Sequence, residues 1–158
     1  VRRPIALDMP DMARLLNEII AQGGTTALTR PVTGADLTEW TQFAPDRNVW
    51  HVAVDAQEKV VGFQWIEPEK DMAEDVAGIA TFVQIGQTGL GIGSKLFDAT
   101  RKAAKALGYV WINANIRADN EGGLIYYQSR GFQDYGVIEG YELANGDIVD
   151  KRLKRYDL

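Results

Sequence analysis

The chain has 158 residues and a formal net charge of −5, and 46% of its residues are hydrophobic and 25% charged. That size and balance predict a single globular domain, residues 1–158, with a substantial core. The acidic balance argues against nucleic acid as the main partner, because phosphate binding requires a basic face. The absence of cysteine from the sequence excludes disulfide scaffolds, thiolate catalysis and cysteine-based zinc sites.

The single histidine and the lack of long apolar runs exclude further classes of function. His51 is the single histidine, which argues against a multi-histidine metal site or a Ser–His–Asp triad, and we expect no metal. No apolar run approaches the roughly 20 residues that span a bilayer. The first residues show neither the apolar core nor the small-residue cleavage site of a signal peptide. We therefore expect a cytoplasmic protein that does not associate with membranes.

The first half of the chain predicts a short strand, two helices and then three strands. Apolar residues recur at helical spacing after Pro10, and Gly23-Gly24 ends that pattern. Later, two alternating runs on either side of a short turn indicate a hairpin. In chain order we expect a strand at 2–7, helices at 9–21 and 33–43, and strands at 49–55, 60–66 and 76–85.

The second half predicts two more helices and three strands. Apolar residues from Ile92 to Leu107 share one helical face, and Gly108 follows as a stop. Asp119 or Asn120 is suited to cap a second helix. We expect strands at 109–116, 132–143 and 148–156. A helix that crosses between two neighbouring strands makes them parallel, whereas hairpins are antiparallel, so the fold class is a mixed α/β sheet.

A glycine-rich loop at residues 82–97 is the most informative stretch. Gly89, Gly91 and Gly93 lie between a β-rich run and an amphipathic helix. Glycine lets backbone N–H groups approach a ligand, and a helix start adds unpaired donors and partial positive charge. The loop therefore predicts an anion site, although a strand–helix turn that simply needs glycine fits the pattern equally well.

Two common nucleotide motifs do not fit this loop. A P-loop ends in Gly-Lys-Ser/Thr, whereas the order here is Gly93-Ser94-Lys95. A dinucleotide fingerprint that starts at Gly89 requires a third glycine where Ser94 stands. One that starts at Gly91 requires it where Leu96 stands.

The loop instead resembles the pyrophosphate-binding motif Q/R-x-x-G-x-G/A of the GNAT acetyltransferases, with residues 88–93 reading TGLGIG. Thr88 departs from the usual Gln or Arg. Residues 120–132 resemble a second motif of that family, N-x-x-A-x-x-x-Y-x-x-x-G-F, with Gly123 in place of alanine. Singly, Asn120 fits a helix cap and Tyr127 a core tyrosine. Together with the glycine loop, they favour the family.

The resemblance implies a GNAT-like fold: a mixed, mostly antiparallel central sheet flanked by helices, with a parallel strand pair at the CoA site. It also implies acetyl-CoA as cosubstrate and direct transfer of the acetyl group to an amine. The residues that we expect at the cofactor are Phe82, Val83, Thr88, Gly89, Leu90, Gly91, Ile92, Gly93, Ser94, Lys95, Asn120 and Tyr127.

The same resemblance assigns chemical roles. Tyr127 is expected to act as general acid to the CoA sulfur, and the backbone N–H near Val83 to donate to the oxyanion. The base is unresolved, because Glu67, Glu69 and Asp75 all lie near strand ends. We take Glu67 as the candidate.

The acceptor is predicted from a looser likeness. Residues 15–28 (LLNEIIAQGGTTAL) and 37–40 (LTEW) loosely resemble the phosphinothricin and methionine-derivative acetyltransferase branch, which acetylates small amino-acid-like amines. That branch usually has a glutamate five residues ahead of Val83, where this chain has Gly78. We expect a small-molecule primary amine as acceptor. A protein N-terminal or lysine amine is the nearest alternative, and a non-catalytic acyl-CoA sensor is an alternative of another class. The resemblance also allows a homodimer.

Overall fold

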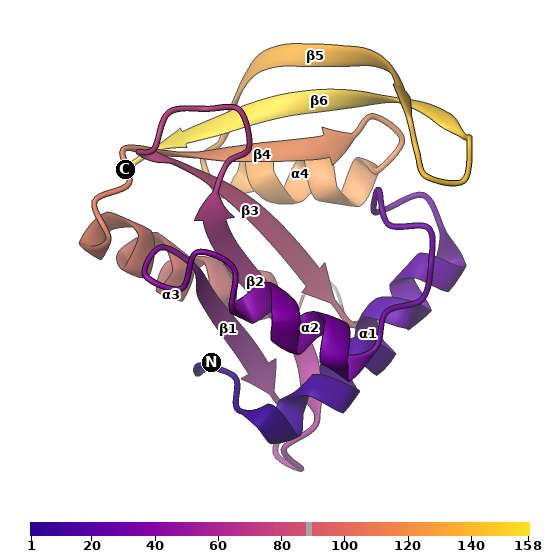
Figure 1. Ribbon diagram of the computed structural model, residues 1–158, viewed down its shortest axis with the longest axis vertical. Coiled ribbons are helices and arrows are strands. Elements are labelled where there is room, and N and C mark those ends of the chain that lie inside the picture. Colours follow the sequence, from indigo (N-terminus) through magenta and orange to yellow (C-terminus); the bar gives the residue numbers. More distant parts are fainter. Residues whose placement is uncertain (88–89) are drawn as a thin grey trace.

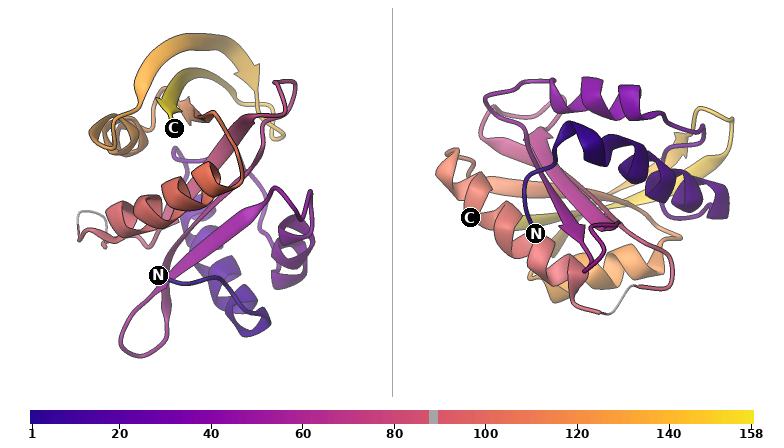
Figure 2. Two further views of the ribbon diagram at one scale, coloured as in Figure 1. Left: turned by 90° about the vertical axis from the view of Figure 1, so that its left-hand side faces the viewer. Right: turned by 90° about the horizontal axis from the view of Figure 1, so that it is seen from below.

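The protein is described by a computed structural model that covers residues 1–87 and 90–158. A six-stranded sheet with the order β1-β2-β3-β4-β6-β5 forms its centre. Helices α1 and α2 cover one face of the sheet, and α3 and α4 cover the other (Figures 1 and 2). In chain order the elements are η1 (Ala6–Asp8), α1 (Met9–Gln22), α2 (Gly34–Thr41), β1 (Val49–Val54), β2 (Val60–Pro68), β3 (Val76–Val83), α3 (Ile92–Ala106), β4 (Trp111–Arg117), α4 (Glu121–Ser129), β5 (Gln133–Glu142) and β6 (Ile148–Asp157).

The sheet confirms the predicted fold class. β1–β2, β2–β3, β4–β6 and β5–β6 pair antiparallel, and β3–β4 is the parallel pair that the crossing helix α3 requires. Side-chain caps begin two of the helices, and of the two candidates for the last helix it is Asn120 that caps α4. The Thr33 hydroxyl accepts from Asp36 N at 3.1 Å at the start of α2, and Asn120 Oδ1 accepts from Gly123 N at 2.9 Å at the start of α4.

The parallel pair is short, and this shapes the centre of the molecule. β3 and β4 are paired only from Val76 opposite Trp111 to Gly78 opposite Asn113. β3 continues to Val83 and β4 to Arg117, and the two strands separate over that length (Figure 1). Backbone groups along a sheet edge need hydrogen-bond partners, so this gap is suited to an extended ligand.

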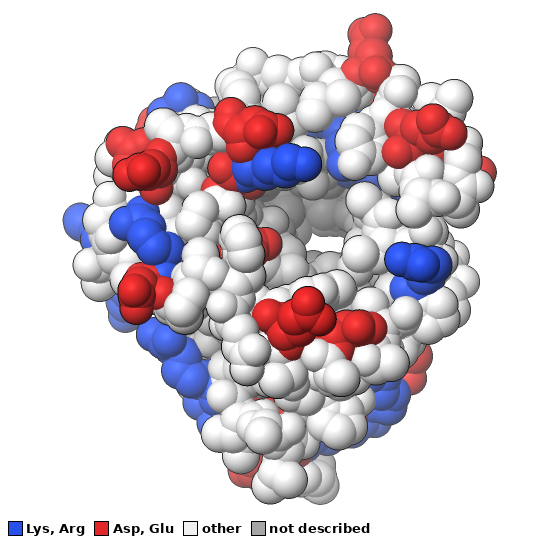
Figure 3. Space-filling view, viewed as in Figure 1, with Lys and Arg blue, Asp and Glu red and all other residues white. Residues whose placement is uncertain are grey.

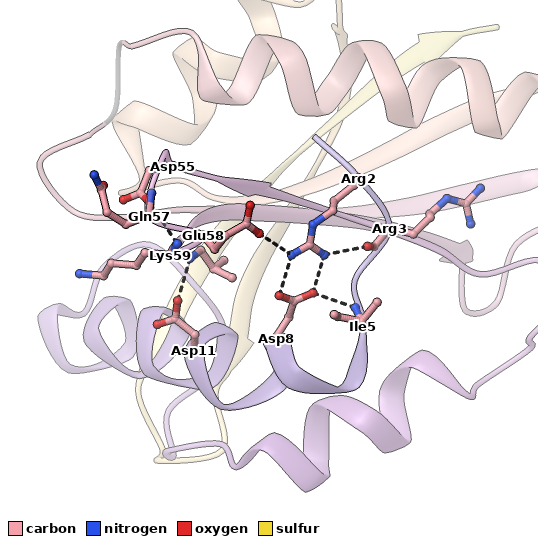
Figure 4. A network of polar contacts seen from close by, with 10 residues as sticks. Arg2, Arg3, Ile5, Asp8, Asp11, Asp55, Gln57, Glu58 and Lys59 are labelled. Carbon is pink, nitrogen blue, oxygen red and sulfur yellow. Dashed lines mark hydrogen bonds and ion pairs between the residues drawn. The ribbon is translucent and has the colours of Figure 1, made fainter.

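The strand predicted at residues 2–7 is wrong. Arg2 alone forms a bridge, with Val52, and the chain turns into η1 at Ala6. The Asp8 carboxylate explains the turn, because it accepts from Arg2 Nη1 and from Ile5 N, both at 2.7 Å (Figure 4). The guanidinium of Arg2 also holds the pKa of Asp8 below its ordinary value. Side-chain acceptors that capture nearby backbone N–H groups compete with strand pairing.

Two apolar cores lie on the two faces of the sheet. Beneath α1 and α2, the Trp50 and Trp65 rings stack with centroids 4.1 Å apart, and Phe63 and Phe82 extend the stack. Under α3 and α4 the second core contains Phe97, Phe132 and Tyr127, among others. Among the described residues, no helix has the length and apolarity needed to cross a membrane.

His51 is a packed residue of strand β1. It is buried, and burial followed by the nearby Arg3 guanidinium lowers its pKa to about 4. The imidazole is therefore neutral at pH 7. The lowered pKa of His51 and its buried position in β1 agree with a structural role.

Candidate active site

A cavity of about 940 Å³ opens where β3 and β4 separate. Figure 3 shows a hollow on this face of the molecule, with charged side chains of both signs around its rim. The walls come from the ends of β3 and β4, from the start of α3, from one side of α4 and from the segment after α1. Its lining includes Thr25, Thr26, Ala80, Thr81, Phe82, Val83, Gly91, Gly93, Ser94, Asn115, Arg117, Asn120, Tyr126, Tyr127, Arg130 and Lys151.

Most of the predicted cofactor residues meet at this cavity. Its lining contains Phe82, Val83, Gly91, Gly93, Ser94, Asn120 and Tyr127. Leu90, Ile92, Lys95 and Glu67 do not line it, and Ile92 packs instead on the core beside Leu96. Thr88 and Gly89 lie outside the described residues.

The start of α3 provides backbone donors at the cavity. Gly91 is the N-cap with φ 81°, a left-handed conformation that favours glycine, and no side chain caps the helix. The first intrahelical bond there runs from Lys95 N to Gly91 O. The preceding N–H groups therefore lack helix partners and carry the positive end of the helix dipole. This arrangement is suited to bind phosphate.

Gly93 has a second reason to be glycine. A Cβ at this position would lie 2.6 Å from Cε1 of Tyr126, and the Tyr126 hydroxyl donates to Gly93 O at 2.7 Å. The close approach of an aromatic ring, rather than the ligand alone, thus requires the missing side chain. The sequence motif did not reveal this contact, because the two residues lie on different helices.

Arg130 is a site residue that the sequence reasoning missed. It lies at the end of α4, lines the cavity and donates through Nη1 to Ser94 Oγ. Its Nε is buried without a partner among the described residues. Its position, three residues after Tyr127 and directly before Gly131, was the available signal. The guanidinium places a positive charge beside the donors of α3.

The Tyr127 hydroxyl belongs to a buried polar network. It lies 2.8 Å from Thr81 Oγ1, which accepts from Gln64 Nε2 at 2.8 Å. Thr81 is therefore free to donate its own hydrogen to Tyr127, which leaves the Tyr127 hydrogen available to a ligand. Burial raises the pKa of Tyr127, and it raises the pKa of Tyr126 to about 12. Both phenols are protonated at neutral pH, but the Tyr126 hydrogen is already donated to Gly93 O.

The backbone of Val83 faces the gap between β3 and β4. Gln84 N donates to Val61 O at 2.9 Å, on the β2 side of β3. Because backbone groups alternate between the two edges of a strand, the N–H of Val83 points to the other edge. This direction fits the predicted oxyanion donor.

Asn120 is held by two hydrogen bonds. Besides capping α4, it donates through Nδ2 to Thr25 O at 3.0 Å, while Arg117 Nη1 donates to Thr26 O at 3.0 Å. These bonds tie the segment after α1 to the turn between β4 and α4. A Cβ at Gly123 would lie 2.9 Å from Cγ of Asn120, which explains the glycine where the motif usually has alanine. Contact between Asn120 and a cofactor stays a prediction.

Two further charged groups, Glu69 and Lys151, lie on the side of the sheet that α1 and α2 cover. Gly78 faces the Glu69 carboxylate, whose pKa is raised by burial and then lowered in part by a hydrogen bond from Asn113. Lys151 lines the cavity and is only 7% exposed, and no carboxylate lies within 4 Å of it in the described part of the chain. Burial lowers the pKa of Lys151, and Glu69 opposes that shift. In the same part of the chain, no cluster of three or more metal-binding side chains is found.

Comparison with known proteins identifies the family. The model of the acetyltransferase (GNAT) domain matches residues 45–134. The chain is 28% identical over 155 residues, 96% of its length and 90% of the relative's, to YwnH of Bacillus subtilis (strain 168), which bears the provisional name phosphinothricin acetyltransferase. This chain belongs to the GNAT acetyltransferase family. The predicted family is confirmed, and the name of YwnH agrees with the predicted branch.

Solved structures show the same fold. A phosphinothricin acetyltransferase from Sinorhizobium meliloti, in complex with acetyl-CoA, matches with a TM-score of 0.88 and 19% identity, over 99% of this chain and 86% of that one. A ribosomal-protein-alanine N-acetyltransferase from Brucella melitensis matches with a TM-score of 0.89 and 19% identity, over 99% and 98%. The match of the family model to residues 45–134 confirms the predicted class of enzyme, an acetyl-CoA-dependent N-acetyltransferase, at the level of the family.

Proposed function

We propose that this protein transfers the acetyl group of acetyl-CoA to the primary amine of a small, amino-acid-like molecule. One observation carries the proposal. A single cavity joins the donors of α3, the Tyr127 hydroxyl and the gap beside β3 to a buried, unpaired lysine on the other side of the sheet.

The residues present fit the cofactor. The N–H groups of Gly93 and Ser94 and the Arg130 guanidinium would hold its pyrophosphate. The pantetheine arm would lie along the open edge of β3, where the N–H of Val83 faces the gap. The orphaned Nε of Arg130 supports this placement, because a buried charged donor without a partner is costly unless a ligand satisfies it.

The proposed chemistry is direct transfer. Acetyl-CoA supplies a thioester, whose C–S bond breaks as the amine nitrogen forms a C–N bond. Val83 N–H would donate to the carbonyl oxygen as negative charge develops there. Tyr127, kept protonated by burial, would donate its hydrogen to the departing sulfur. Holding both reactants in one cavity supplies the effect of proximity.

The acceptor class rests on Lys151. A cation that is removed from water and has no carboxylate beside it is suited to an anionic group of the ligand. An amino-acid-like acceptor brings such a carboxylate, together with the amine to be acetylated. The provisional name of YwnH points to the same class.

We propose further that residues 1–158 form one domain and that the protein is a homodimer. β5 lies at an edge of the sheet and exposes Tyr135, Val137 and Tyr141. A partner could cover this edge. Size-exclusion chromatography with light scattering measures the oligomeric state directly.

A screen of acceptors tests the function. Thiol release from acetyl-CoA is measured with free amino acids, sulfoximines, polyamines, aminoglycosides and peptides. We expect release with acceptors that carry both an amine and a free carboxylate. Release with peptides alone would indicate a protein acetyltransferase. Tight binding of acetyl-CoA without release from any acceptor would indicate a sensor.

A further inference from the structure

We propose that Glu69 is the proton acceptor for the acceptor amine, and that it reaches this position because residue 78 is a glycine. The inference rests on the proposed function and assigns a further residue to the same site. The related branch usually has its glutamate on β3, at the position of Gly78. In this chain the carboxylate would come instead from the segment after β2.

The space over Gly78 is filled by Glu69. A Cβ built on Gly78 would overlap Oε2 of Glu69 and lie 3.1 Å from its carboxyl carbon. The backbone holds the segment there, since Glu69 N donates to Val76 O at 3.0 Å. The Glu69 carboxylate thus occupies the volume that a side chain at position 78 would have.

The surroundings of Glu69 orient and tune the carboxylate. Asn113 is the partner of Gly78 in the parallel pair, and hydrogen bonding by its side chain lowers the pKa of Glu69 against the effect of burial. Asn113 Oδ1 accepts from the Tyr135 hydroxyl, so its amide nitrogen is the group left for Glu69. The other charged groups that act on Glu69 are Glu67 of β2, which raises its pKa, and Lys151 of β6, which lowers it.

Glu69 does not line the cavity itself but lies one same-face step along the sheet from its lining. Gly78 and Asn113 are the last paired residues before β3 and β4 separate. Ala80 and Asn115, which are two residues further on and face the same side, line the cavity. Successive side chains on one face of a strand are about 7 Å apart, a spacing that one water molecule spans.

The proton balance explains the need for such a group. At neutral pH an α-amine with a pKa near ~8 is mostly an ammonium ion, which cannot attack a thioester. Glu69 takes one proton and leaves a neutral amine, whose nitrogen lone pair forms the C–N bond. The electron pair of the C–S bond goes to sulfur, which takes the hydrogen of Tyr127, and the second proton that the nitrogen loses restores Tyr127. Glu69 then returns its proton to solvent, so the net reaction releases one proton.

Burial makes Glu69 a better proton acceptor than an ordinary glutamate, because its pKa is raised. The other two carboxylates considered from the sequence are less well placed. Glu67 Oε1 accepts from Trp65 Nε1 at 3.2 Å, and Asp75 is exposed. The assignment of Glu67 stays a prediction, and the structure favours its neighbour.

The first experiment compares Glu69→Gln with Glu74→Gln, a matched change at an exposed carboxylate of the same segment. We expect Glu69→Gln to lower kcat/KM by about 100-fold, within the range for general base catalysis. In the wild type, the plot of kcat/KM against pH should show a rise that reports the raised pKa of Glu69. That rise should disappear in Glu69→Gln, while the rise caused by deprotonation of the acceptor amine should stay. The Kd of acetyl-CoA and the melting temperature should not change. Glu74→Gln should behave as the wild type.

The second experiment moves the carboxylate. Glu69→Ala should lose activity, and Gly78→Glu added to it should recover about tenfold or more and restore the first rise in the pH profile. Gly78→Ala alone should lower activity, since its Cβ displaces Glu69. An active wild type with an unchanged Glu69→Gln, or loss of that rise only in Glu67→Gln, would overturn the inference and leave the proposed function standing. A wild type that acetylates no amine would overturn the proposed function itself.

Discussion

The two faces of the sheet build their parts of the site in different ways. Under α3 and α4, the cofactor face draws mainly on two continuous segments, residues 91–94 and 120–130, and uses backbone donors, hydroxyls and the Arg130 guanidinium. On the side of the sheet that α1 and α2 cover, the acceptor face gathers Gly78, Asn113 and Lys151 from three strands and Glu69 from the segment after β2. Residues that lie close together in the sequence form a recognisable motif. Residues that only the fold brings together do not.

Electrostatics separates the two faces as well. On the cofactor face burial keeps the Tyr127 hydroxyl protonated and neutral, so its role does not depend on a charged side chain. On the acceptor face burial opposes the charge of both Glu69 and Lys151, and each partly restores the charge of the other. An acceptor with an amine and a carboxylate would complete that pair of charges. The acceptor face is therefore the one whose substitutions should depend on pH and on the charge of the substrate.

The largest effect expected among the following changes is at Tyr127, whose hydroxyl on the cofactor face would reach the reacting sulfur. Tyr127→Phe removes the hydrogen that would be donated to sulfur, and we expect kcat to fall about 100-fold. The Kd of acetyl-CoA, measured by calorimetry, should change by about twofold or less, because a phenol hydrogen bond to sulfur is weak in the ground state.

Tyr126→Phe is the matched control for that change. It should affect cofactor binding more than kcat, since the Tyr126 hydroxyl donates to Gly93 O and not to a ligand. If Tyr127→Phe turned over at the wild-type rate, Tyr127 would lose its role as general acid.

A substitution at the start of α3, which should affect only cofactor binding, is expected to have a smaller effect. In Gly93→Val, the new side chain meets the Tyr126 ring, which must shift together with the start of α3. We expect the Kd of acetyl-CoA to rise about tenfold, equivalent to ~1.4 kcal/mol, with little change in the KM of the acceptor.

Gly34→Ala serves as the control for Gly93→Val, because a Cβ there meets only ordinary contacts at 3.5 Å, at the start of α2. Melting temperatures of both variants separate local from global effects. Equal affinities of a folded Gly93→Val and the wild type would remove α3 from the cofactor site.

Sequence reasoning reached the fold and the cofactor face because local patterns encode them. Asn120 starts its helix as one of the two predicted caps, and the helix predicted between two strands after Val83 requires the parallel pair. The strand at residues 2–7 was wrong because Asp8 captures the backbone ahead of it.

The acceptor face was hidden for a related reason. The choice between Glu67 and Glu69 depends on how the chain turns after Pro68 and on the space over Gly78. Neither feature produces a periodic pattern that could be recognised in the sequence. Lys151 lies in a strand rich in charged residues, where its burial depends on packing against Tyr141. No motif distinguishes it from its exposed neighbours.

The smallest effect expected tests the acceptor face through Lys151. Lys151→Met keeps an unbranched side chain over the Tyr141 ring, which the ammonium group approaches at 3.6 Å, and removes the charge. We expect the KM of a carboxylate-bearing acceptor to rise about fivefold to tenfold, the order of one charge-assisted hydrogen bond. The carboxamide of the same acceptor is the matched control, because it has no charge for Lys151 to bind and its KM should hardly change. The variant should melt no lower than the wild type, since a buried cation without a carboxylate partner does not stabilise the fold. An equal rise in KM for the acid and the amide would mean that Lys151 shapes the cavity without binding charge, and the contrast between the two faces would then rest on Glu69 alone.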